Sequence, residues 1–175
     1  RIPIVYVGDA DYWEKQNSAL LNLTTKVPEG TTGVRPVPGV WYRIENKGHS
    51  QNGGMVIDLH DAPSGQGGNP ILVYGRASGP NQWFRLKPAE GEWFRIQNKN
   101  GLYLDVHDAE SGHSGLPVNA WAKGFDPNQL FRVEYDSDNW YRIQNRAGLY
   151  LDVEMGEQRL GAPVLVEGRK SNQFT

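Results

Sequence analysis

Apolar and polar residues alternate in short stretches of this chain, which is the pattern of strands that bury one face. In the stretch GLYLDVHDA, which begins at Gly101, aliphatic side chains occupy every second position. Leu104 and Val106 share one face, whereas Tyr103 and Asp105 lie on the other. We therefore expect the aliphatic face to form a core and the aspartate to point outward.

The next apolar stretch, PVNAW, predicts a second strand with the same division of faces. Val118 and Ala120 are expected to point inward, which leaves Asn119 and Trp121 on the outer face. The residues between the two stretches are rich in Gly, Ser and Asp, and this composition is typical of a hairpin loop.

This arrangement occurs three times along the chain. Each unit opens with WYRIEN, WFRIQN or WYRIQN and continues with GMVIDLHDA, GLYLDVHDA or GLYLDVEMG, then with PILVY, PVNAW or PVLVE. Three aspartates recur at equal intervals of 47 residues, and they are Asp58, Asp105 and Asp152. A fourth segment in each unit begins at an Asn-Gln pair, namely Asn81-Gln82, Asn128-Gln129 and Asn172-Gln173. The repeats predict an all-β chain with four extended segments in each of three units.

A unit of about 45 residues is also the size of a propeller blade or a solenoid repeat. Three copies are too few for a propeller of about 4 to 8 blades. The units also lack the single aligned strand that stacks in a solenoid. A closed threefold β structure is the remaining interpretation.

The order of these motifs resembles the ricin B-chain type of β-trefoil lectin, also known as a carbohydrate-binding module. The resemblance rests on the motifs G-L-x-L-D-V, G-x-P-V-x-x-W and N-Q-x-F. It implies a β-trefoil with three pseudo-symmetric four-strand repeats, and shallow sites for galactose-type sugars on these repeats. The expected divisions are an N-terminal extension with a linker at 1–39, a trefoil domain at 40–175, and repeats at 40–89, 92–136 and 139–175.

The second repeat contains the side chains that recognition of a neutral sugar requires. A sugar presents hydroxyls, which a carboxylate and an amide can bind, and a C–H face, which an aromatic ring can cover. By resemblance to the family, the residues that contact sugar are Asp105, Asn119, Trp121 and Asn128. Gln129 is expected to support the loop behind them.

The other two repeats keep only part of this set. The candidate residues of the first repeat are Asp58, Tyr74, Asn81 and Gln82, with Leu72 at the position of Asn119. Those of the third repeat are Asp152, Asn172 and Gln173, with Leu165 and Glu167 at the positions of Asn119 and Trp121. The second repeat should therefore bind sugar best and the third least.

A purely structural interpretation applies to the same residues. A repeated aspartate at the end of a strand can tie down the following turn, and the Asn-Gln amides can satisfy backbone groups where the fourth strand begins. For the three glutamines we expect this structural role. For Asp105 and Trp121 together we expect sugar contact, because an exposed tryptophan with no packing role otherwise lacks an explanation.

Composition and charge exclude several classes of function. The 175 residues carry a formal charge of −2, with both signs scattered, so nucleic acid and anionic membranes are not expected partners. No apolar run is long enough to span a membrane, and we expect a soluble protein, either secreted or cytoplasmic. There is no cysteine, hence no disulfide and no thiolate metal site.

Catalysis, metals and cofactors are not expected either. The chain contains no phosphate-binding loop and no nucleophile motif. Glycoside hydrolysis needs two carboxyls within about 5 to 10 Å, whereas threefold symmetry separates the repeated aspartates. The histidines are spread over several loops, and His107 is expected to border the second site without a metal.

Glycans or glycoconjugates are the expected partners, and homo-oligomerisation or fusion to another domain is compatible with the sequence. Two alternatives stay open. The chain could be a β-trefoil that binds protein through its loops, such as a protease inhibitor. It could also be the sugar-targeting module of a larger hydrolase or toxin.

The segment before the repeats raises a question of closure. The third unit ends with NQFT, whereas the others continue as NQWFRL and NQLFRV. Placing Arg1-Ile2 after Thr175 gives NQFTRI, in register with the other two. One hypothesis is that the strand starting at Arg1 lies at the vacant edge beside the last repeat and closes the barrel. The alternative is that both ends are cut from a longer chain.

Overall fold

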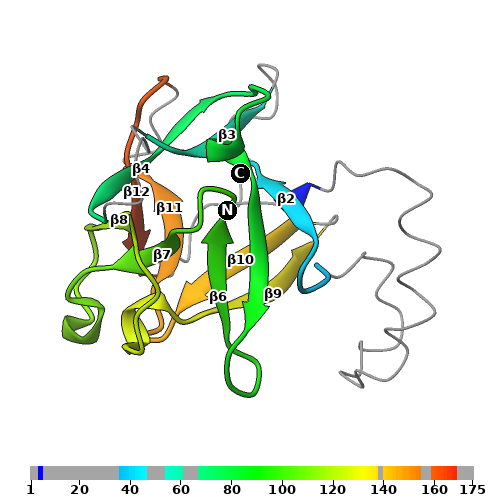
Figure 1. The fold of residues 1–175 in the computed structure, drawn as a ribbon. Coiled ribbons are helices and arrows are strands. Elements are labelled where there is room, and N and C mark those ends of the chain that lie inside the picture. The colour runs from blue at the N-terminus through cyan, green and yellow to red at the C-terminus, as the bar shows by residue number, and fades with distance from the viewer. Residues whose placement is uncertain are drawn as a thin grey trace.

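The computed structural model describes residues 4–5, 36–46, 54–60, 67–137, 140–154 and 159–168. Twelve strands and three short 3-10 helices lie in these ranges (Figure 1), and none of the described helices is long and apolar enough to cross a membrane. The strands are β1 (Ile4–Val5), β2 (Trp41–Ile44), β3 (Met55–Leu59), β4 (Asn69–Gly75), β5 (Phe84–Pro88), β6 (Phe94–Asn98), β7 (Tyr103–Val106), β8 (Leu116–Trp121), β9 (Phe131–Ser137), β10 (Trp140–Asn145), β11 (Tyr150–Val153) and β12 (Val164–Glu167). The 3-10 helices are η2 (Pro80–Gln82), η3 (Ala109–Ser111) and η4 (Pro127–Gln129).

The strands form one antiparallel sheet that closes into a β-trefoil. Its order is β1-β2-β5-β6-β9-β10-β11-β12-β8-β4-β3, with β7 between β6 and β8. The first unit consists of β2 to β5, the second of β6 to β9, and the third begins with β10 to β12. Figure 1 shows β7, β8, β11 and β12 gathered on one side of the molecule, and β2, β6, β9 and β10 on the other. The all-β trefoil fold expected from the repeats is thereby confirmed.

The alternation of the sequence accounts for the core. Leu104, Val106 and Ala120 are fully buried, and Val118 is nearly so, as the period of two predicted. The isoleucine of each opening motif joins them, as does the phenylalanine that begins β5 and β9. Each unit therefore contributes the same positions to one shared core.

Three backbone hydrogen bonds join the units around the pseudo-threefold axis. Gly68 N donates to Ala120 O at 2.8 Å, so the loop of the first unit contacts the third strand of the second. The equivalent bonds run from Gly161 N to Val73 O (2.7 Å) and from Gly115 N to Val166 O (2.8 Å). The three glycines have φ values of 91°, 81° and 86°, a conformation that side chains other than glycine rarely adopt. The same glycine is thus required in each hairpin loop.

The N-terminal strand β1 corrects part of the closure hypothesis. It pairs with β2 of the first unit, with Ile4 opposite Ile44, and no described residue of the third unit forms a ladder with it. The reason lies in the trefoil connectivity: β5 pairs with β6 and β9 with β10, so the fourth strand of one unit always pairs with the first strand of the next. After the third unit, the next first strand is β2.

The register shows which place β1 occupies. Ile4 is opposite Ile44 in the same way that Leu86 is opposite Ile96 and Val133 is opposite Ile143. β1 therefore lies where the pseudo-symmetry requires a fourth strand for the third unit. The aligned residue is Ile4 and not Ile2, and residues 1–3 and 169–175 lie outside the described ranges.

A buried asparagine at the end of β6 fixes the segment that begins β5. The Nδ2 atom of Asn98 donates to Asn81 O at 2.9 Å and Trp83 O at 3.2 Å, and its Oδ1 accepts from Asn100 N at 2.9 Å. Asn145 occupies the same position of β10, but there only Oδ1 is paired, with Leu149 N at 2.9 Å, and Nδ2 has no partner among the described residues.

These two asparagines make a matched pair for mutagenesis. Asn98→Ala removes three hydrogen bonds and leaves Asn81 O and Asn100 N without these partners, whereas Trp83 O keeps its bond from Lys99 N. It should therefore destabilise the fold by roughly 1–3 kcal/mol more than Asn145→Ala. Urea unfolding of both variants measures the difference. Equal losses of stability would show that the two extra bonds of Asn98 contribute nothing net.

Candidate functional site

The aspartate of the second unit is held by a buried glutamine. The Nε2 atom of Gln129 donates to Asp105 Oδ2 at 3.0 Å and to Ala122 O at 2.9 Å, while its Oε1 accepts from Gly124 N at 2.8 Å. Only 2% of Gln129 is exposed. Its amide is fully used within the protein, and it therefore positions the carboxylate and the loop after β8.

The first unit repeats this arrangement. Gln82 Nε2 donates to Asp58 Oδ2 at 2.8 Å and to Gly75 O at 2.9 Å, and its Oε1 accepts from Ala77 N at 2.7 Å. In addition, Asn81 Nδ2 donates to the same Oδ2 atom at 2.7 Å. The structural role expected for these glutamines agrees with the geometry of both units.

Both aspartates keep one oxygen for a ligand. Among the described residues, no hydrogen bond involves the Oδ1 atom of Asp58 or Asp105. An ionised carboxylate accepts up to about four hydrogen bonds, so an oriented carboxylate with a free oxygen can receive hydroxyl groups. The two side chains are less open than expected, because only 6% of Asp58 and 8% of Asp105 is exposed. They point away from the core but are covered by the amides that hold them.

Burial raises the pKa of Asp105 above its ordinary value of 3.8. The hydrogen bond from Gln129 and the nearby His107 act in the opposite direction, and the carboxylate of Asp126 raises the pKa further. The site therefore contains a second acidic residue, which the repeat pattern did not indicate because the first unit has Gly79 at this position.

The strand register verifies the alignment of the three units. Asp58 is opposite Leu72, Asp105 opposite Asn119, and Asp152 opposite Leu165. The position predicted for an aromatic ring lies two residues further along each third strand. It is Tyr74 opposite Val56 in the first unit, Trp121 opposite Tyr103 in the second, and Glu167 opposite Tyr150 in the third. The second unit alone places an amide opposite the aspartate.

Trp121 is exposed over 45% of its surface and is supported from behind by the first unit. A Cβ atom added to Gly67 would lie 2.0 Å from Trp121 Cε3, and one added to Gly68 would lie 3.3 Å from Cζ2. The hairpin loop of the first unit thus packs on the ring so closely that only glycine fits. The alternation within one unit gave no indication of this contact.

The aromatic side chain of the first unit has a different environment. Tyr74 stacks on His60 with 5.7 Å between ring centroids and 14° between ring planes. Its hydroxyl lies near Gly161, where an added Cβ would be 3.2 Å away. The first site therefore presents a tyrosine–histidine pair where the second presents a tryptophan.

A cavity of about 440 Å³ lies beside Asp105, between the loops that contain η3 and η4. Asn128 lines it together with His107 and Asp126, and the remaining lining residues are Asp108, Ser111, His113 and Leu116. Neither Asp105 nor Trp121 is part of this lining. The predicted residues thus form two adjoining groups. Asn128 and His107 line the cavity. Asp105 and Asn119 stand opposite each other on the neighbouring strands β7 and β8. Within the part of the chain described, no group of three or more His, Asp or Glu side chains could hold a metal ion.

The third unit is incomplete as a site. Asp152 is half-buried, and its Oδ1 accepts a hydrogen bond from Val153 N at 2.8 Å. Its predicted partners Asn172 and Gln173 lie outside the described residues. Of the set that surrounds Asp105, the third unit has neither the amide opposite the aspartate nor the aromatic ring.

Residues 80–167 match the ricin-type beta-trefoil lectin domain-like family. The chain belongs to this family. Among curated proteins, none matches the chain significantly. The family match and the solved structures of the same fold are therefore the grounds for assigning this chain to a family.

Several solved structures share this lectin fold. The designed threefold symmetric protein ThreeFoil is 26% identical with a TM-score of 0.66, over 75% of this chain and 91% of that one. The Macrolepiota procera ricin B-like lectin, solved in complex with lactose, is 22% identical with a TM-score of 0.63, over 78% and 91%. An exo-beta-1,3-galactanase from Clostridium thermocellum is 23% identical with a TM-score of 0.68, over 77% of this chain but only 28% of the enzyme.

The contact between Gly67 and Trp121 can be tested directly. Gly67→Ala should push the indole ring from its position, because the added methyl group overlaps a rigid ring, and should weaken sugar binding by the second unit about threefold or more. Gly75→Ala is the matched control, since an added Cβ there meets nothing within 4 Å. Indole N–H shifts in NMR spectra report the ring position. Unchanged Trp121 shifts in Gly67→Ala would contradict the packing argument.

The raised pKa of Asp105 predicts the pH dependence of the second site. If Asp105 accepts the hydroxyl groups of a sugar, it does so as the ionised carboxylate, and affinity should then fall on acidification at a pH above that of an ordinary aspartate. Asp126→Asn removes one cause of the increase and should move the midpoint to lower pH. NMR titrations at several pH values, in an Asp58→Ala background, measure both midpoints. A midpoint that stays the same in Asp126→Asn would refute the influence of Asp126.

Proposed function

We propose that this chain is a lectin that binds neutral, galactose-type sugars through its second and first units, without a chemical step. The observation that supports this proposal is the pair of fixed carboxylates. In each of the two units, a buried glutamine holds Oδ2 of the aspartate, and Oδ1 is left without a partner among the described residues. A side chain that only tied down a turn would not need this support.

The support lowers the cost of binding. A free aspartate would lose rotational freedom when it receives a sugar hydroxyl, whereas Asp105 is already fixed by Gln129. Part of the conformational entropy of this side chain is therefore already lost when the protein folds, and not when the sugar binds. Asn119 lies opposite Asp105 and can donate and accept hydrogen bonds. Trp121 supplies an exposed ring, which can cover the C–H face of a sugar.

Galactose-type sugars are proposed by analogy with two structural relatives. The Macrolepiota procera lectin binds lactose, which contains galactose, and the Clostridium thermocellum enzyme is a galactanase. Both share the trefoil fold with this chain, at 22% and 23% identity. The aspartate, amide and ring of the second unit are compatible with a galactose-type sugar.

Valency follows from the pseudo-symmetry. The sites of the first and second units belong to different sectors of the trefoil, and each offers few contacts, so the affinity of a single site should be weak. A glycan surface that engages both sites would bind far more tightly, because the second contact forms at a high effective concentration.

The proposal ranks the three aspartates. Asp105→Ala should reduce lactose binding about tenfold or more, because a charged acceptor of hydroxyl groups is lost. Asp58→Ala should remove a smaller share, and Asp152→Ala little. Titration calorimetry and NMR with lactose measure the affinities, a chelator tests for independence from metal, and thermal unfolding checks that each variant is folded. If folded Asp152→Ala loses more affinity than Asp105→Ala, or if lactose and galactose fail to bind the wild type, the proposal is wrong.

A further inference from the structure

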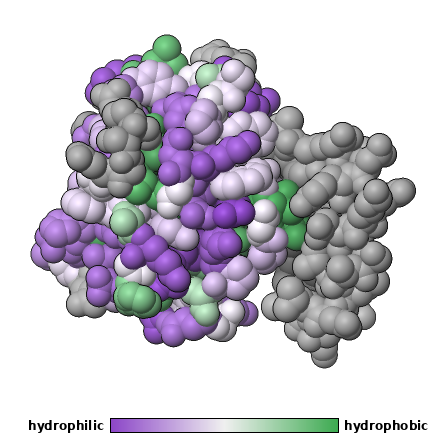
Figure 2. Space-filling view, viewed as in Figure 1, coloured by the Kyte–Doolittle hydropathy of each residue, from purple (hydrophilic) through white to green (hydrophobic). Residues whose placement is uncertain are grey.

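A second surface lies on the outer side of the barrel strands and borders the loop that Gln82 holds in the first unit. It covers the outer face of β2, β5 and β6, and we refer to it as the cationic face. It contains five cations, Arg43, Arg85, Lys87, Arg95 and Lys99, and two tryptophans, Trp41 and Trp83. Cross-strand pairs place Trp41 beside Arg85, Arg85 beside Gln97, and Lys87 beside Arg95. Figure 2 shows mainly hydrophilic residues in the middle of the view, where Figure 1 shows β6 and its neighbours.

The tryptophans hold the cations in place. The guanidinium carbon of Arg43 lies 4.4 Å from the Trp83 ring centroid, and that of Arg85 lies 4.5 Å from Trp41. Lys99 Nζ lies about equally far from both rings, at 5.9 and 6.0 Å. Guanidinium groups stacked on rings lose little further freedom when they bind a ligand.

No carboxylate among the described residues neutralises this face. Arg85 bonds to the Gln97 amide at 3.0 and 2.8 Å, and Arg43 bonds to Ala77 O at 2.6 Å. Lys87 and Arg95 form no hydrogen bond or ion pair through their side chains with a described residue, although they stand opposite each other as like charges. Of the nearby carboxylates, Glu45 pairs with Arg76 and Glu90 with Arg146, and the exposed Glu92 in the turn between β5 and β6 forms no ion pair with a described residue.

Two further donors on this face are unsatisfied. The Nε atoms of Arg43 and Arg95 are buried and have no partner among the described residues. A buried donor without a partner is uncommon in folded proteins. A like-charge pair across two strands is also unfavourable. A bound anion would reduce the repulsion between Lys87 and Arg95, whereas the two buried Nε atoms lie beneath the surface that such an anion would contact.

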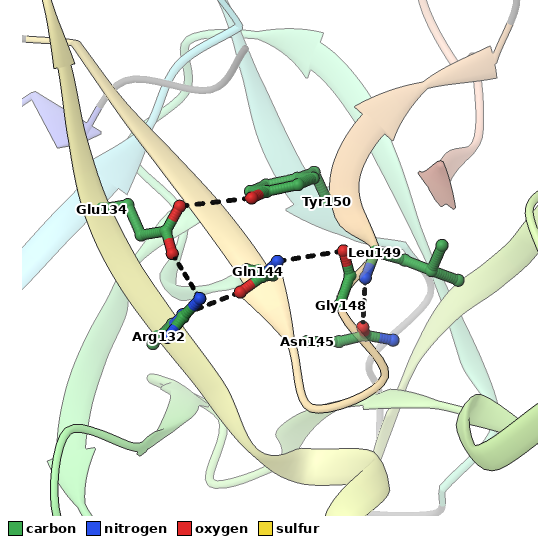
Figure 3. A network of polar contacts seen from close by, with 7 residues as sticks. All are labelled: Arg132, Glu134, Gln144, Asn145, Gly148, Leu149 and Tyr150. Carbon is green, nitrogen blue, oxygen red and sulfur yellow. Dashed lines mark hydrogen bonds and ion pairs between the residues drawn. The ribbon is translucent and has the colours of Figure 1, made fainter. Parts of the chain in front are cut away.

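The equivalent face between the second and third units serves as an internal control. There Glu134 stands opposite Arg142, at the positions that Lys87 and Arg95 hold in the first face. Figure 3 shows Glu134 bound to Arg132 and Tyr150, and Arg132 bound to Gln144. Arg142 in turn pairs with Asp136 at 2.8 Å. The trefoil therefore does not require a cationic face, and only one of the two equivalent faces lacks acidic partners.

We propose that the cationic face binds an acidic polysaccharide, whose carboxylate or sulfate groups pair with the guanidinium and ammonium groups. Cations two residues apart on a strand are separated by about 7 Å and those on neighbouring strands by about 5 Å, so several anions along a flexible sugar chain can be met at once. A sugar chain is favoured over nucleic acid because the chain belongs to a lectin domain family. This face shares no residue with the aspartate sites, although Arg43 bonds to the loop that Gln82 holds beside Asp58.

The test uses polygalacturonate and dextran sulfate as probes, with neutral dextran as the uncharged control. Both anionic probes, or one of them, should bind at about 50 mM salt and weaken strongly as salt is added, because screening reduces contacts between exposed charges. Biolayer interferometry with the full chain measures the affinities. Absence of binding by both anionic probes at low salt, or equal binding of neutral dextran, would overturn the proposal.

Lys87→Glu is the decisive variant because it copies Glu134 onto the first face. It should weaken binding of the anionic probe about tenfold or more by reversing one contact charge. It should not lower the melting temperature, since it replaces a like-charge pair with an opposite-charge pair. Lys123→Glu, an exposed charge change outside this face, is the control and should alter affinity less than twofold. Equal effects of the two variants would show that only net charge matters and would refute the site.

Two comparisons separate this proposal from others. Asp105→Ala should bind the anionic probe as the wild type does, so a failed lactose test leaves the cationic face untouched. Single-stranded DNA and phosphatidylserine vesicles serve as alternative polyanions. If either binds more tightly than both anionic polysaccharides through Lys87, the class of partner proposed here is wrong.

Discussion

One constraint recurs throughout this fold: each unit is completed by its neighbour. The hairpin loop of every unit donates a glycine N–H to the third strand of another unit, the fourth strands of the first two units pair with the first strand of the next, and β1 pairs with β2. A single unit of about 45 residues could not bury its apolar face alone. The shared core and the three loop contacts therefore form together, and the sites outside them depend on this closure.

The sequence allowed much of the fold to be predicted. The interval of 47 residues between aspartates aligned the three units, and the strand register agrees with this alignment, because Asp58, Asp105 and Asp152 stand opposite Leu72, Asn119 and Leu165, the residues assigned to one repeat position. It also gave the glutamines a structural role, which agrees with the hydrogen bonds of Gln82 and Gln129 to the aspartates and loops. Local patterns of this kind are visible in one unit and are reinforced by three copies.

What could not be predicted lies between units or departs from the repeat. Gly67 behind Trp121 and the partner of β1 are contacts between segments that no periodicity connects. The residue of β1 that aligns with the other units is two positions later than expected. Because strand side chains alternate with a period of two, a shift of two residues keeps each side chain on the same face, and the alternation could not distinguish the two alignments. Asp126 has no counterpart in the first unit, and the burial of the aspartates depends on amides 23 or 24 residues away.

The packing behind Trp121 limits how this protein could be made symmetric. The residue before the loop glycine is Gly67 in the first unit, Ser114 in the second and Leu160 in the third. Ser114 accepts a hydrogen bond from Gly168 N and Leu160 is exposed, so glycine occurs at this position where the neighbouring unit presents a tryptophan. A protein built from three copies of the second unit would place a serine behind every indole ring, where even its Cβ has no room. Such a design would need Ser114→Gly in each copy, so the strongest predicted site is the joint property of two units that differ in sequence.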